Sequence, residues 1–447
     1  MKTLEEVLKD SKEKLGLKIP CSIEILSPVH IGSGIKLTEG IDFINTGQSV
    51  EIISQADLMS YFEVNPDELN KFIACNYDIR QLSKLPGSRK YNLEIRKSKE
   101  IFEFLRNGFG KPYIPGSSIK GSIRTIILKK IFDNLTENEK NKLLQKTCKL
   151  NKKSEFASQP ILEDIFGKDQ QYNLMRTLEI FDFYFEPEDV DLSKVLVLSF
   201  TNESGTSYGW KQMGRPSRNV SNIKEATSIF VESLLVGAKS YGSISLNKFL
   251  MENKEAKEKL NFDNPFLKNI ESLIKAINDY SLDKLNSEKN FFEKLNSKMT
   301  LSSLIANIDS IIEKIKKLQK NEFILRLSWR SGWKSMTGDF IGELKKDEKE
   351  KWIEYFREKY CNQNKMKIGR PGFSIFPKTR KIVFEDEQPS YLTGWIKVKL
   401  YETKPIELKN NLTGEKQTSN KKKESSEIDL SILKGKFKVI ENKKNQK

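Results

Sequence analysis

One amphipathic helix between alternating strands limits the folds that this 447-residue chain can adopt. After a Pro-Gly turn at 115–116, isoleucines recur at helical spacing up to about residue 133: Ile119, Ile123, Ile126, Ile127 and Ile131. Such residues form one apolar stripe, which must be buried against another element. Ser117 or Ser118 is the predicted N-cap, because a hydroxyl at this position accepts a bond from the first turn.

The strands occur in the order that a split βαβ unit requires. Alternating or apolar runs predict a first strand from residue 19, which opens into a glycine loop ending at 34, and then a hairpin at 41–54. Further strands are predicted at 176–186, 194–202 and 227–238, one that begins at 321, and a last one at 395–402. Strand, hairpin, helix and two further strands give a ferredoxin-like or RRM-like plan. The sequence therefore predicts an α+β fold.

Composition divides the chain into four parts. These are an RRM-like domain (1–250) that includes a polar excursion (203–226), a Lys-, Glu- and Leu-rich helical insertion (251–320), a second β-containing part (321–405) and a basic low-complexity tail (406–447). The tail is polar and poor in aromatics, so we expect it to be disordered.

The charge balance favours a polyanionic partner. The chain has 77 Lys and Arg against 61 Asp and Glu, a net charge of +16. Nucleic acid is the commonest ligand of such a surplus. The alternative is the lysine-rich composition of a heat-adapted organism, in which Lys and Glu rise together.

Several classes of site are disfavoured by the sequence. The four cysteines, Cys21, Cys75, Cys148 and Cys361, lie far apart and only one histidine is present, so we expect no zinc site, no metal and no cofactor. We interpret the cysteines as buried side chains in a reducing compartment. The chain lacks an 18-residue apolar run and an apolar signal sequence, which predicts a cytoplasmic protein without a membrane partner.

The stretch "YIPGSSIKGSIRTIIL" (113–128) resembles a phosphate loop but lacks the Gly-Lys-Ser/Thr ending of a Walker motif, so nucleotide hydrolysis is not supported. Unpaired N–H groups at a helix start, with basic residues one turn apart, can bind a phosphate of an RNA backbone. The candidate residues are Gly116, Ser117, Ser118, Lys120 and Arg124. The alternative is an ordinary helix start with two solvated basic residues.

The motif "IPGSSIKGSIR" strongly resembles that of the RAMP superfamily of CRISPR proteins. The stretches "SPVHIGSG", "EATSIFVESLLVGAKSYGSI" and "RSGWKSMTG" followed by "FPKTRKIVFEDEQPSYLTGWIKVKL" agree with it. The stretches "RSGWKSMTG" and "FPKTRKIVFEDEQPSYLTGWIKVKL" are most similar to the subunits that cap the filament of type III-A (Csm) effector complexes. The resemblance covers about residues 19–250 and 321–402.

This resemblance implies RRM-like domains that hold guide (CRISPR) RNA by its backbone, at the 3′ side of the guide. It implies a non-catalytic subunit that supports guide maturation and assembly, while the guide RNA reads sequence by base pairing. The partners implied are the guide RNA, the repeated backbone subunit and the small subunit. Whether a host nuclease docks to trim the guide stays open.

The excursion at 203–226 interleaves aromatic and basic residues: Tyr208, Trp210, Lys211, Arg215 and Arg218. This pattern suits base stacking and phosphate contact. In the family this position is a thumb-like hairpin, so we expect an exposed Trp210 that wedges the RNA strand. The alternative is a surface loop with a packing tryptophan.

A second group of candidates surrounds the loop after residue 327: Arg326, Arg330, Trp333 and Lys334. Family members carry a glycine loop here that faces RNA, which makes Arg330 and Lys334 predicted RNA contacts. Trp333 is equally consistent with a core position.

Two residues raise the question of catalysis. His30, the only histidine, follows the first strand, where related proteins use a histidine to pack, to touch phosphate or as a general base. We expect it to contact RNA without catalysing. Asp42 matches a loop that supports metal-dependent cleavage in a related subunit, but it opens an alternating strand and favours a strand-edge role. A guide-processing or target-cleaving endoribonuclease, and a pure protein scaffold, remain the alternatives.

Overall fold

The computed structural model describes residues 18–401, with gaps at 75–78, 86–87, 94, 96–98, 141, 144–158, 169, 201–206, 215–217, 261–265, 268, 297–298, 328 and 330–378. The predicted tail (406–447) and three of the four cysteines (Cys75, Cys148 and Cys361) lie outside these residues. Cys21 is buried, and burial raises the pKa of its thiol to about 12.

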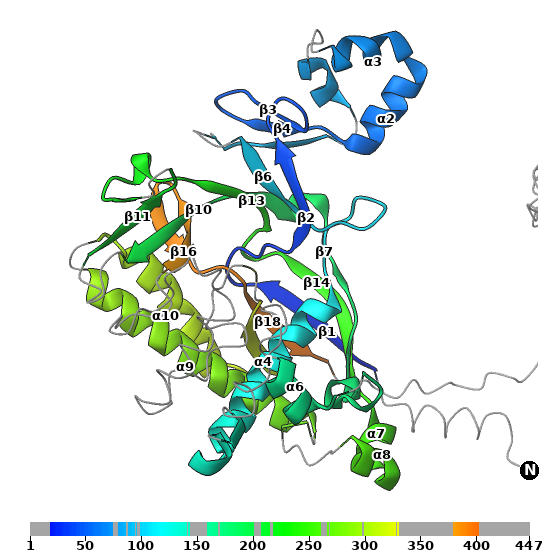
Figure 1. The fold of residues 1–447 in the computed structure, drawn as a ribbon, viewed down its shortest axis with the longest axis vertical. Coiled ribbons are helices and arrows are strands. Elements are labelled where there is room, and N and C mark those ends of the chain that lie inside the picture. The colour runs from blue at the N-terminus through cyan, green and yellow to red at the C-terminus, as the bar shows by residue number, and fades with distance from the viewer. Residues whose placement is uncertain are drawn as a thin grey trace, which may run out of the picture. The chain divides into compact units, whose positions relative to one another are not determined.

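A five-stranded antiparallel sheet carries the central helix (Figure 1). Its strands, in sheet order, are β15 (Glu322–Arg326), β18 (Trp395–Leu400), β1 (Lys18–Ile25), β14 (Lys239–Leu246) and β8 (Leu178–Ile180). Helix α4 (Gly116–Asn134) lies between β1 and β8 in the chain, and α9 (Ile270–Asn296) lies between β14 and β15. The strand order β18-β1-β14-β8 is that of a split βαβ unit, so the predicted ferredoxin-like fold is confirmed, although its third strand is β14 and not the predicted strand at 194–202.

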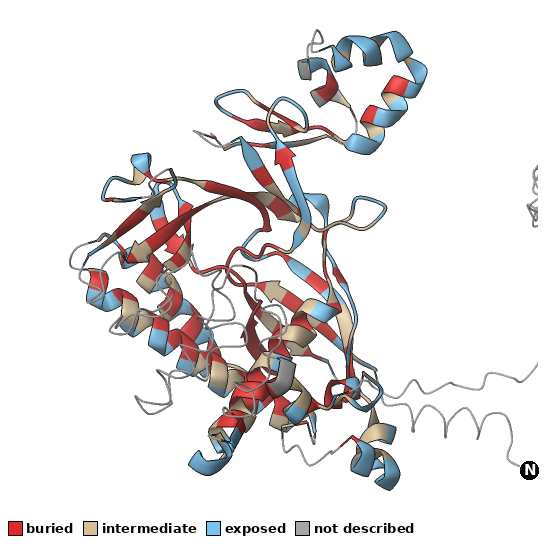
Figure 2. Ribbon diagram, viewed as in Figure 1, coloured by how far each residue is buried: buried red, intermediate tan, exposed pale blue. Residues whose placement is uncertain are grey.

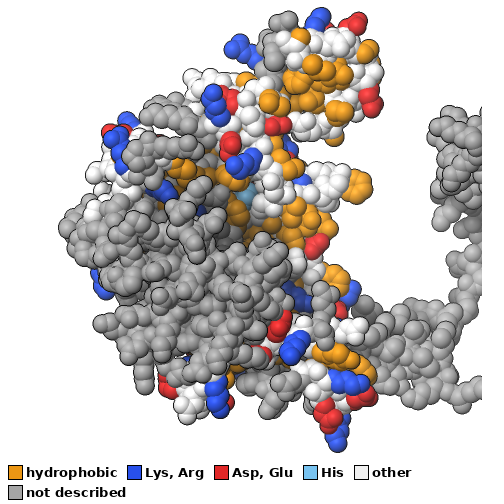
Figure 3. All heavy atoms as spheres, in the orientation of Figure 1, with side chains coloured by type: hydrophobic (Ala, Val, Ile, Leu, Met, Phe, Trp, Pro, Cys, Tyr) orange, Lys and Arg blue, Asp and Glu red, His pale blue; other side chains and the backbone are white. Residues whose placement is uncertain are grey.

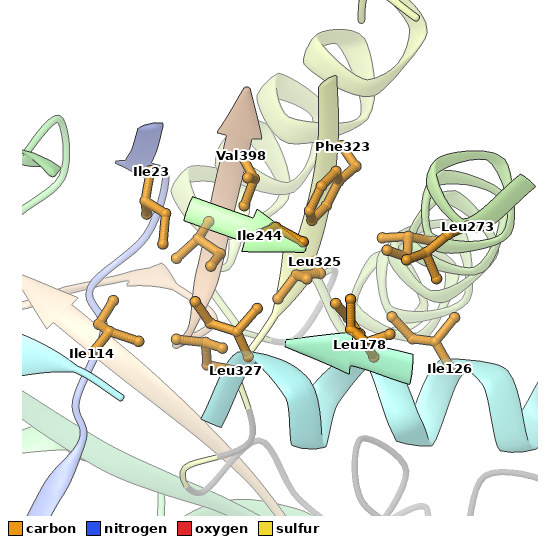
Figure 4. Packing of buried hydrophobic residues seen from close by; sticks show 14 of the residues in the cluster. Ile23, Ile114, Ile126, Leu178, Ile244, Leu273, Phe323, Leu325, Leu327 and Val398 are labelled. Carbon is orange, nitrogen blue, oxygen red and sulfur yellow. The ribbon is translucent and has the colours of Figure 1, made fainter. Parts of the chain in front are cut away.

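The core between this sheet and its helices is apolar. Figure 4 shows Ile23 and Val398 of the sheet in one cluster with Ile126 of α4 and Leu273 of α9. The predicted stripe of α4 is buried in this cluster, apart from Ile131, which packs against it partly buried. Truncating a buried side chain of this size to Ala typically costs about 2–5 kcal/mol, so this core holds the orientation of α4.

A second, eight-stranded sheet was not predicted. Its strands are β12 (Arg218–Val220), β11 (Tyr208–Gln212), β10 (Val190–Phe200), β13 (Ile229–Leu234), β6 (Glu100–Phe104) and β2 (Gly32–Thr38). In addition, β16 (Thr379–Glu385) pairs with β10, and β17 (Gln388–Tyr391) pairs with β16. Residues 32–34, predicted as a loop, begin β2, where the register with β6 shifts between Gly32 and Lys36. The predicted strands at 194–202 and 227–238 correspond to β10 and β13.

Helices were predicted within 251–320, and the described residues there include α8 (Lys254–Lys259), α9 and α10 (Ser302–Lys316). Two further helices are α6 (Gln159–Phe166) and α7 (Lys248–Glu252). The first half of α9 packs into the core of the five-stranded sheet through Leu273 and Ile277. Its second half packs through Leu285 and Phe292 into the core beneath β10, β11 and β16. Helix α9 therefore joins the two sheets.

A small lobe follows the predicted hairpin. This hairpin is confirmed as β3 (Phe43–Asn45) and β4 (Val50–Ile52). Strand β4 also pairs with β5 (Arg89–Tyr91). The α2–α3 lobe, made of α2 (Gln55–Val64) and α3 (Pro66–Ile73), connects β4 to β5 and is mostly exposed or intermediate (Figure 2). Hydrophobic side chains gather on its surface (Figure 3), and its exposed large ones are Met59, Val64, Leu69 and Ile73.

A buried carboxylate ties the small sheet to the large one. The Glu232 side chain, on β13, is fully buried and accepts a hydrogen bond from the Tyr91 hydroxyl (2.6 Å) and one from the Phe104 N–H (2.8 Å). It also forms ion pairs with Arg89 Nε (3.0 Å) and Arg106 Nη2 (3.3 Å). These partners come from β5, β6 and the residues just after β6.

Burial alone would raise the pKa of Glu232. Arg89 and Arg106, together with the two hydrogen bonds, outweigh burial and hold this pKa below its usual value. Because the folded-state pKa is depressed, the carboxylate contributes stability above its unfolded pKa of about 4.3. That contribution is lost as the pH falls through the folded pKa.

We predict that Glu232→Gln lowers the free energy of unfolding by about 3–5 kcal/mol at neutral pH, because it leaves the largely buried Arg106 guanidinium without its carboxylate partner and leaves Arg89 with its longer pair to Glu103. The acid-side loss of stability should also become shallower in this variant. Chemical denaturation between pH 3 and pH 7 measures both effects. Glu100→Gln, which removes an exposed pair with Lys36, is the control, with an expected loss under about 1 kcal/mol. Equal losses in the two variants would contradict the assignment.

Candidate nucleic-acid interface

Helix α4 begins where β7 (Tyr113–Ile114) ends, and β7 pairs with β9 (Phe183–Tyr184). The N-cap is Pro115, which makes no side-chain cap bond, so the cap predicted at Ser117 or Ser118 is wrong. The first N–H group, that of Gly116, donates to the Asp182 carboxylate at 2.9 Å. Asp182 lies 66 residues later in the chain, so this contact is tertiary.

Asp182 changes where a phosphate can bind. A carboxylate at a helix N-terminus interacts favourably with the helix dipole, as a phosphate would. Because Asp182 already accepts the Gly116 N–H, the tip of the helix is not the open anion site that the sequence predicted. The sides of its first two turns remain available.

Gly116 is a glycine because of packing. A Cβ at this position would lie 2.0 Å from the carbonyl oxygen of Ile180 and 2.6 Å from its carbonyl carbon. Gly116 is itself buried. Its role is therefore the close approach of α4 to the chain after β8, and a direct contact between Gly116 and RNA does not fit this geometry.

Gly121 lacks such a reason within the fold. A Cβ there would meet nothing within 4 Å, although glycine inside a helix costs about 1 kcal/mol relative to Ala. Ser117 and Arg124, four residues before and three after it, are exposed on the same side of α4. We call Ser117, Lys120, Gly121 and Arg124 the α4 face. It offers a bare helix backbone beside an exposed guanidinium group.

The two basic residues of the α4 face are not equivalent. Lys120 is half-buried, and burial lowers the pKa of its ammonium group, although Glu179 acts in the opposite direction. Arg124 is exposed to solvent. Ser118, at the edge of the face, is half-buried. Arg124 is thus the more accessible cation, and Lys120 lies closer to the body of the protein.

The predicted thumb-like excursion forms a hairpin, because β11 and β12 pair antiparallel. The expectation of an exposed Trp210 is wrong. Its side chain is only 3% exposed and packs edge-on against Phe384 of β16, with ring centroids 5.0 Å apart. Trp210 therefore belongs to the core that α9 and α10 cover.

The basic residues of this hairpin are more accessible than its tryptophan. Arg218 is exposed, and its Nε donates to the Gln212 side chain at 2.6 Å. Lys211 is half-buried. Arg215 lies outside the described residues, as do Arg330, Trp333 and Lys334.

His30 occupies a buried position. It is 2% exposed, its Nδ1 lies 2.6 Å from the Glu232 carbonyl oxygen, and its ring contacts Trp329 edge-on at 4.2 Å. This environment favours packing. It gives no support to a direct RNA contact or to general-base catalysis by His30.

Asp42 and Arg326 have structural partners. The Asp42 carboxylate accepts from the Thr38 N–H at 2.8 Å and from the Gln55 side chain at 2.9 Å, which closes the turn before β3. Arg326 is buried and its Nε donates to the Thr393 carbonyl at 2.7 Å. Burial lowers the pKa of Arg326 to about 10. Arg326 thus lies inside the protein.

Two kinds of feature are absent from the described residues. No group of three or more His, Cys, Asp or Glu is placed to hold a metal ion. No helix has both the length and the apolar character needed to cross a membrane.

Comparison with known proteins decides the family. A model of the RAMP superfamily matches residues 22–369, which is most of the chain. The chain belongs to the RAMP superfamily. The superfamily resemblance of the 114–124 motif is thereby confirmed.

Individual relatives point to one branch of this superfamily. The chain is 30% identical over 131 residues to the CRISPR system Cms protein Csm5 of Streptococcus thermophilus, covering 24% of this chain and 37% of that protein. This match therefore spans well under half of the relative's length.

Two solved structures have a similar fold. A chain of the Csm-crRNA-target RNA ternary complex of a type III-A CRISPR-Cas system matches with a TM-score of 0.55 and 22% identity, over 86% of this chain and all of that one. The crystal structure of T. onnurineus Csm5 matches with a TM-score of 0.52 and 16% identity, over 84% of this chain and 99% of that one.

We predict that Gly116→Ala lowers stability by about 1–3 kcal/mol or more, because the added methyl group overlaps backbone atoms. In contrast, Gly121→Ala should raise stability by about 0.5–1 kcal/mol, since the site is open and Ala favours the helix. Denaturant midpoints of the two variants measure this difference. If Gly116→Ala has the same denaturant midpoint as the native protein, the close approach of α4 to Ile180 is wrong.

Proposed function

We propose that this chain is a non-catalytic RNA-binding subunit of a type III-A CRISPR (Csm) effector complex. In this proposal it caps the backbone of the complex at the 3′ side of the guide RNA. The α4 face carries the proposal, because it combines an exposed Arg124 with a helix backbone left bare at Gly121. The RAMP fold, the net charge of +16 and the similarity to a chain of a Csm-crRNA-target RNA complex support it.

The mechanism is electrostatic and independent of sequence. Phosphate contacts position a nucleic-acid strand but do not read its bases. Arg124 and Lys120 neutralise guide phosphates, while Gly121 lets the sugar-phosphate backbone approach the helix closely. Arg218 of the β11–β12 hairpin is a further accessible cation for the same strand. Base pairing by the guide then supplies all sequence specificity.

The environments of His30 and Asp42 favour a non-catalytic role. A general base needs to reach the 2′-hydroxyl proton that it removes, but His30 is buried against Glu232 and Trp329. The Asp42 carboxylate closes a local turn. Guide maturation is accordingly supported by holding and assembling the RNA, and a nuclease that trims the guide would be a separate protein.

Neighbouring subunits of the complex are the proposed protein partners. The α2–α3 lobe exposes Met59, Val64, Leu69 and Ile73, and contiguous apolar surface of this kind marks interaction sites. The repeated backbone subunit and the small subunit are the candidates, as the family resemblance implies.

We predict that Lys120→Ala combined with Arg124→Ala weakens binding of unrelated single-stranded RNAs about equally. Removing two phosphate contacts should also reduce the slope of log K against log salt by about 1.4, or 0.7 per contact. Filter binding or anisotropy from 50 to 300 mM salt, over which the Debye length falls by more than half, measures both. Lys314→Ala with Lys317→Ala, both exposed at the C-terminal end of α10, removes the same charge elsewhere. Equal effects of the two double variants would contradict a specific α4 face.

We also predict that Gly121→Ala separates binding from stability. The methyl group should weaken RNA affinity by holding the strand away from the helix, even though the same change stabilises the fold. RNA titrations and thermal melts on one preparation test this. Unchanged affinity would remove Gly121 from the interface.

A separate outcome would favour an endoribonuclease instead. This outcome is RNA cleavage by the protein, with or without metal, that is lost in His30→Ala or Asp42→Ala.

A further inference from the structure

The loop between β6 and β7 presents an aromatic side chain that the sequence analysis did not single out. Phe109 is 98% exposed, at the tip of residues 107–111, and is flanked by Gly108 and Gly110. This loop extends outward beside β7 (Figure 1), and hydrophobic atoms are visible at its outer end (Figure 3). Burying a phenylalanine is worth about 1.5–3 kcal/mol, so the fold gains nothing from this placement.

Local hydrogen bonds hold this loop in one shape. The side-chain oxygen of Asn107 accepts from the N–H groups of Phe109 and Lys111, each at 3.0 Å. The N–H of Asn107 donates to the Lys111 carbonyl at 3.0 Å, and Gly110 adopts the left-handed conformation with φ +76°. The exposed ring therefore stands on an ordered turn.

Arg106 connects this turn to the protein interior. One of its terminal nitrogens lies 3.3 Å from the Gly110 carbonyl oxygen, and the other lies 3.3 Å from the buried Glu232 carboxylate. On the far side of the loop, Lys111 pairs with Glu186 at 2.8 Å. A ligand that binds Phe109 would therefore meet a turn whose backbone is already ordered.

The surroundings of Phe109 favour a nucleic-acid base over a protein pocket. Anchor side chains at protein interfaces are usually ringed by contacts that exclude water. Phe109 instead stands among two glycines, Asn107, Arg106 and Lys111, and a Cβ at either glycine would meet nothing within 4 Å. Both faces of the ring are thus open. Stacking on a base needs only these faces, and it accepts any base.

The loop also lies close to the α4 face along the chain. Phe109 and Gly116 are seven positions apart, so the two lie within about 25 Å of each other even in a fully extended chain. One RNA strand can therefore contact the α4 face with its phosphates and Phe109 with a base.

We propose that Phe109 is a stacking site for one base of single-stranded RNA, held ready by Asn107 and Arg106. This proposal rests on the proposed RNA-binding function and adds a contact that is independent of base identity and of phosphate charge. Phe109 takes the role that the sequence analysis gave to Trp210.

The test compares variants of the full-length chain for binding to uridine-rich and adenosine-rich single-stranded RNA. Phe109→Ala should weaken both by about 5- to 150-fold, whereas Phe109→Trp should remain within about twofold of the native protein. The salt slope should be unchanged in Phe109→Ala, because no phosphate contact is lost. Phe249→Ala, which removes a half-exposed phenylalanine from α7, is the matched control. Ultraviolet crosslinking should place an RNA adduct at residue 109.

The outcomes separate this inference from the proposed function. If Phe109→Ala leaves RNA affinity unchanged while the Lys120 and Arg124 double variant loses it, stacking is overturned and the RNA-binding function stands. If Phe109→Ala impairs only assembly with other subunits, the ring is a protein contact and the proposal is wrong. If the native chain does not bind RNA, both fail. Because the Phe109 side chain is almost fully exposed, an unchanged melting temperature is expected and controls for folding.

Discussion

The buried carboxylate of Glu232 determines the arrangement of much of the second sheet. A charge in the protein interior is tolerated only when paired and hydrogen-bonded, so its partners must occupy fixed positions. Arg89 and Tyr91 bring in β5, the Phe104 N–H brings in β6, and Arg106 brings in the loop that carries Phe109. The carbonyl of the same residue also positions His30. One side chain thus links the small sheet that contains the hairpin at 43–52, strand β6 of the large sheet and an exposed loop.

Two glycines of one motif serve different physical purposes. Gly116 lets α4 approach the backbone after β8, and this need is satisfied entirely inside the chain. Gly121 leaves a stretch of helix where an added Cβ would meet no atom of the described residues within 4 Å, although glycine weakens a helix. A residue that costs stability without an internal reason points to a ligand outside the chain. Family motifs alone cannot make this distinction, because they weight both positions alike.

Local patterns predicted the elements whose partners are close in the chain or in the βαβ order. The stripe of α4, the turn at Gly47 and the strands β1, β10 and β18 follow from spacing and turn chemistry. What failed depended on distant contacts. Trp210 looked exposed because its neighbours are polar, yet β16 brings Phe384 over it. The cap of α4 comes from Asp182, and β2 extends into the predicted glycine loop because β6 pairs with it. Phe109 was missed because exposure at a short turn is decided by what else packs there.

The candidate interface combines two kinds of energy that respond differently to solution conditions. The phosphate contacts proposed for Arg124 and Lys120 would depend on counterion release and weaken steeply with salt. The stacking proposed for Phe109 would depend on the contact of ring faces and change little with salt. Charge alone would let an RNA strand slide along α4, since successive phosphates are equivalent. An aromatic ring at one point, on a turn tied through Arg106 to Glu232, would give the strand a fixed register without reading its sequence.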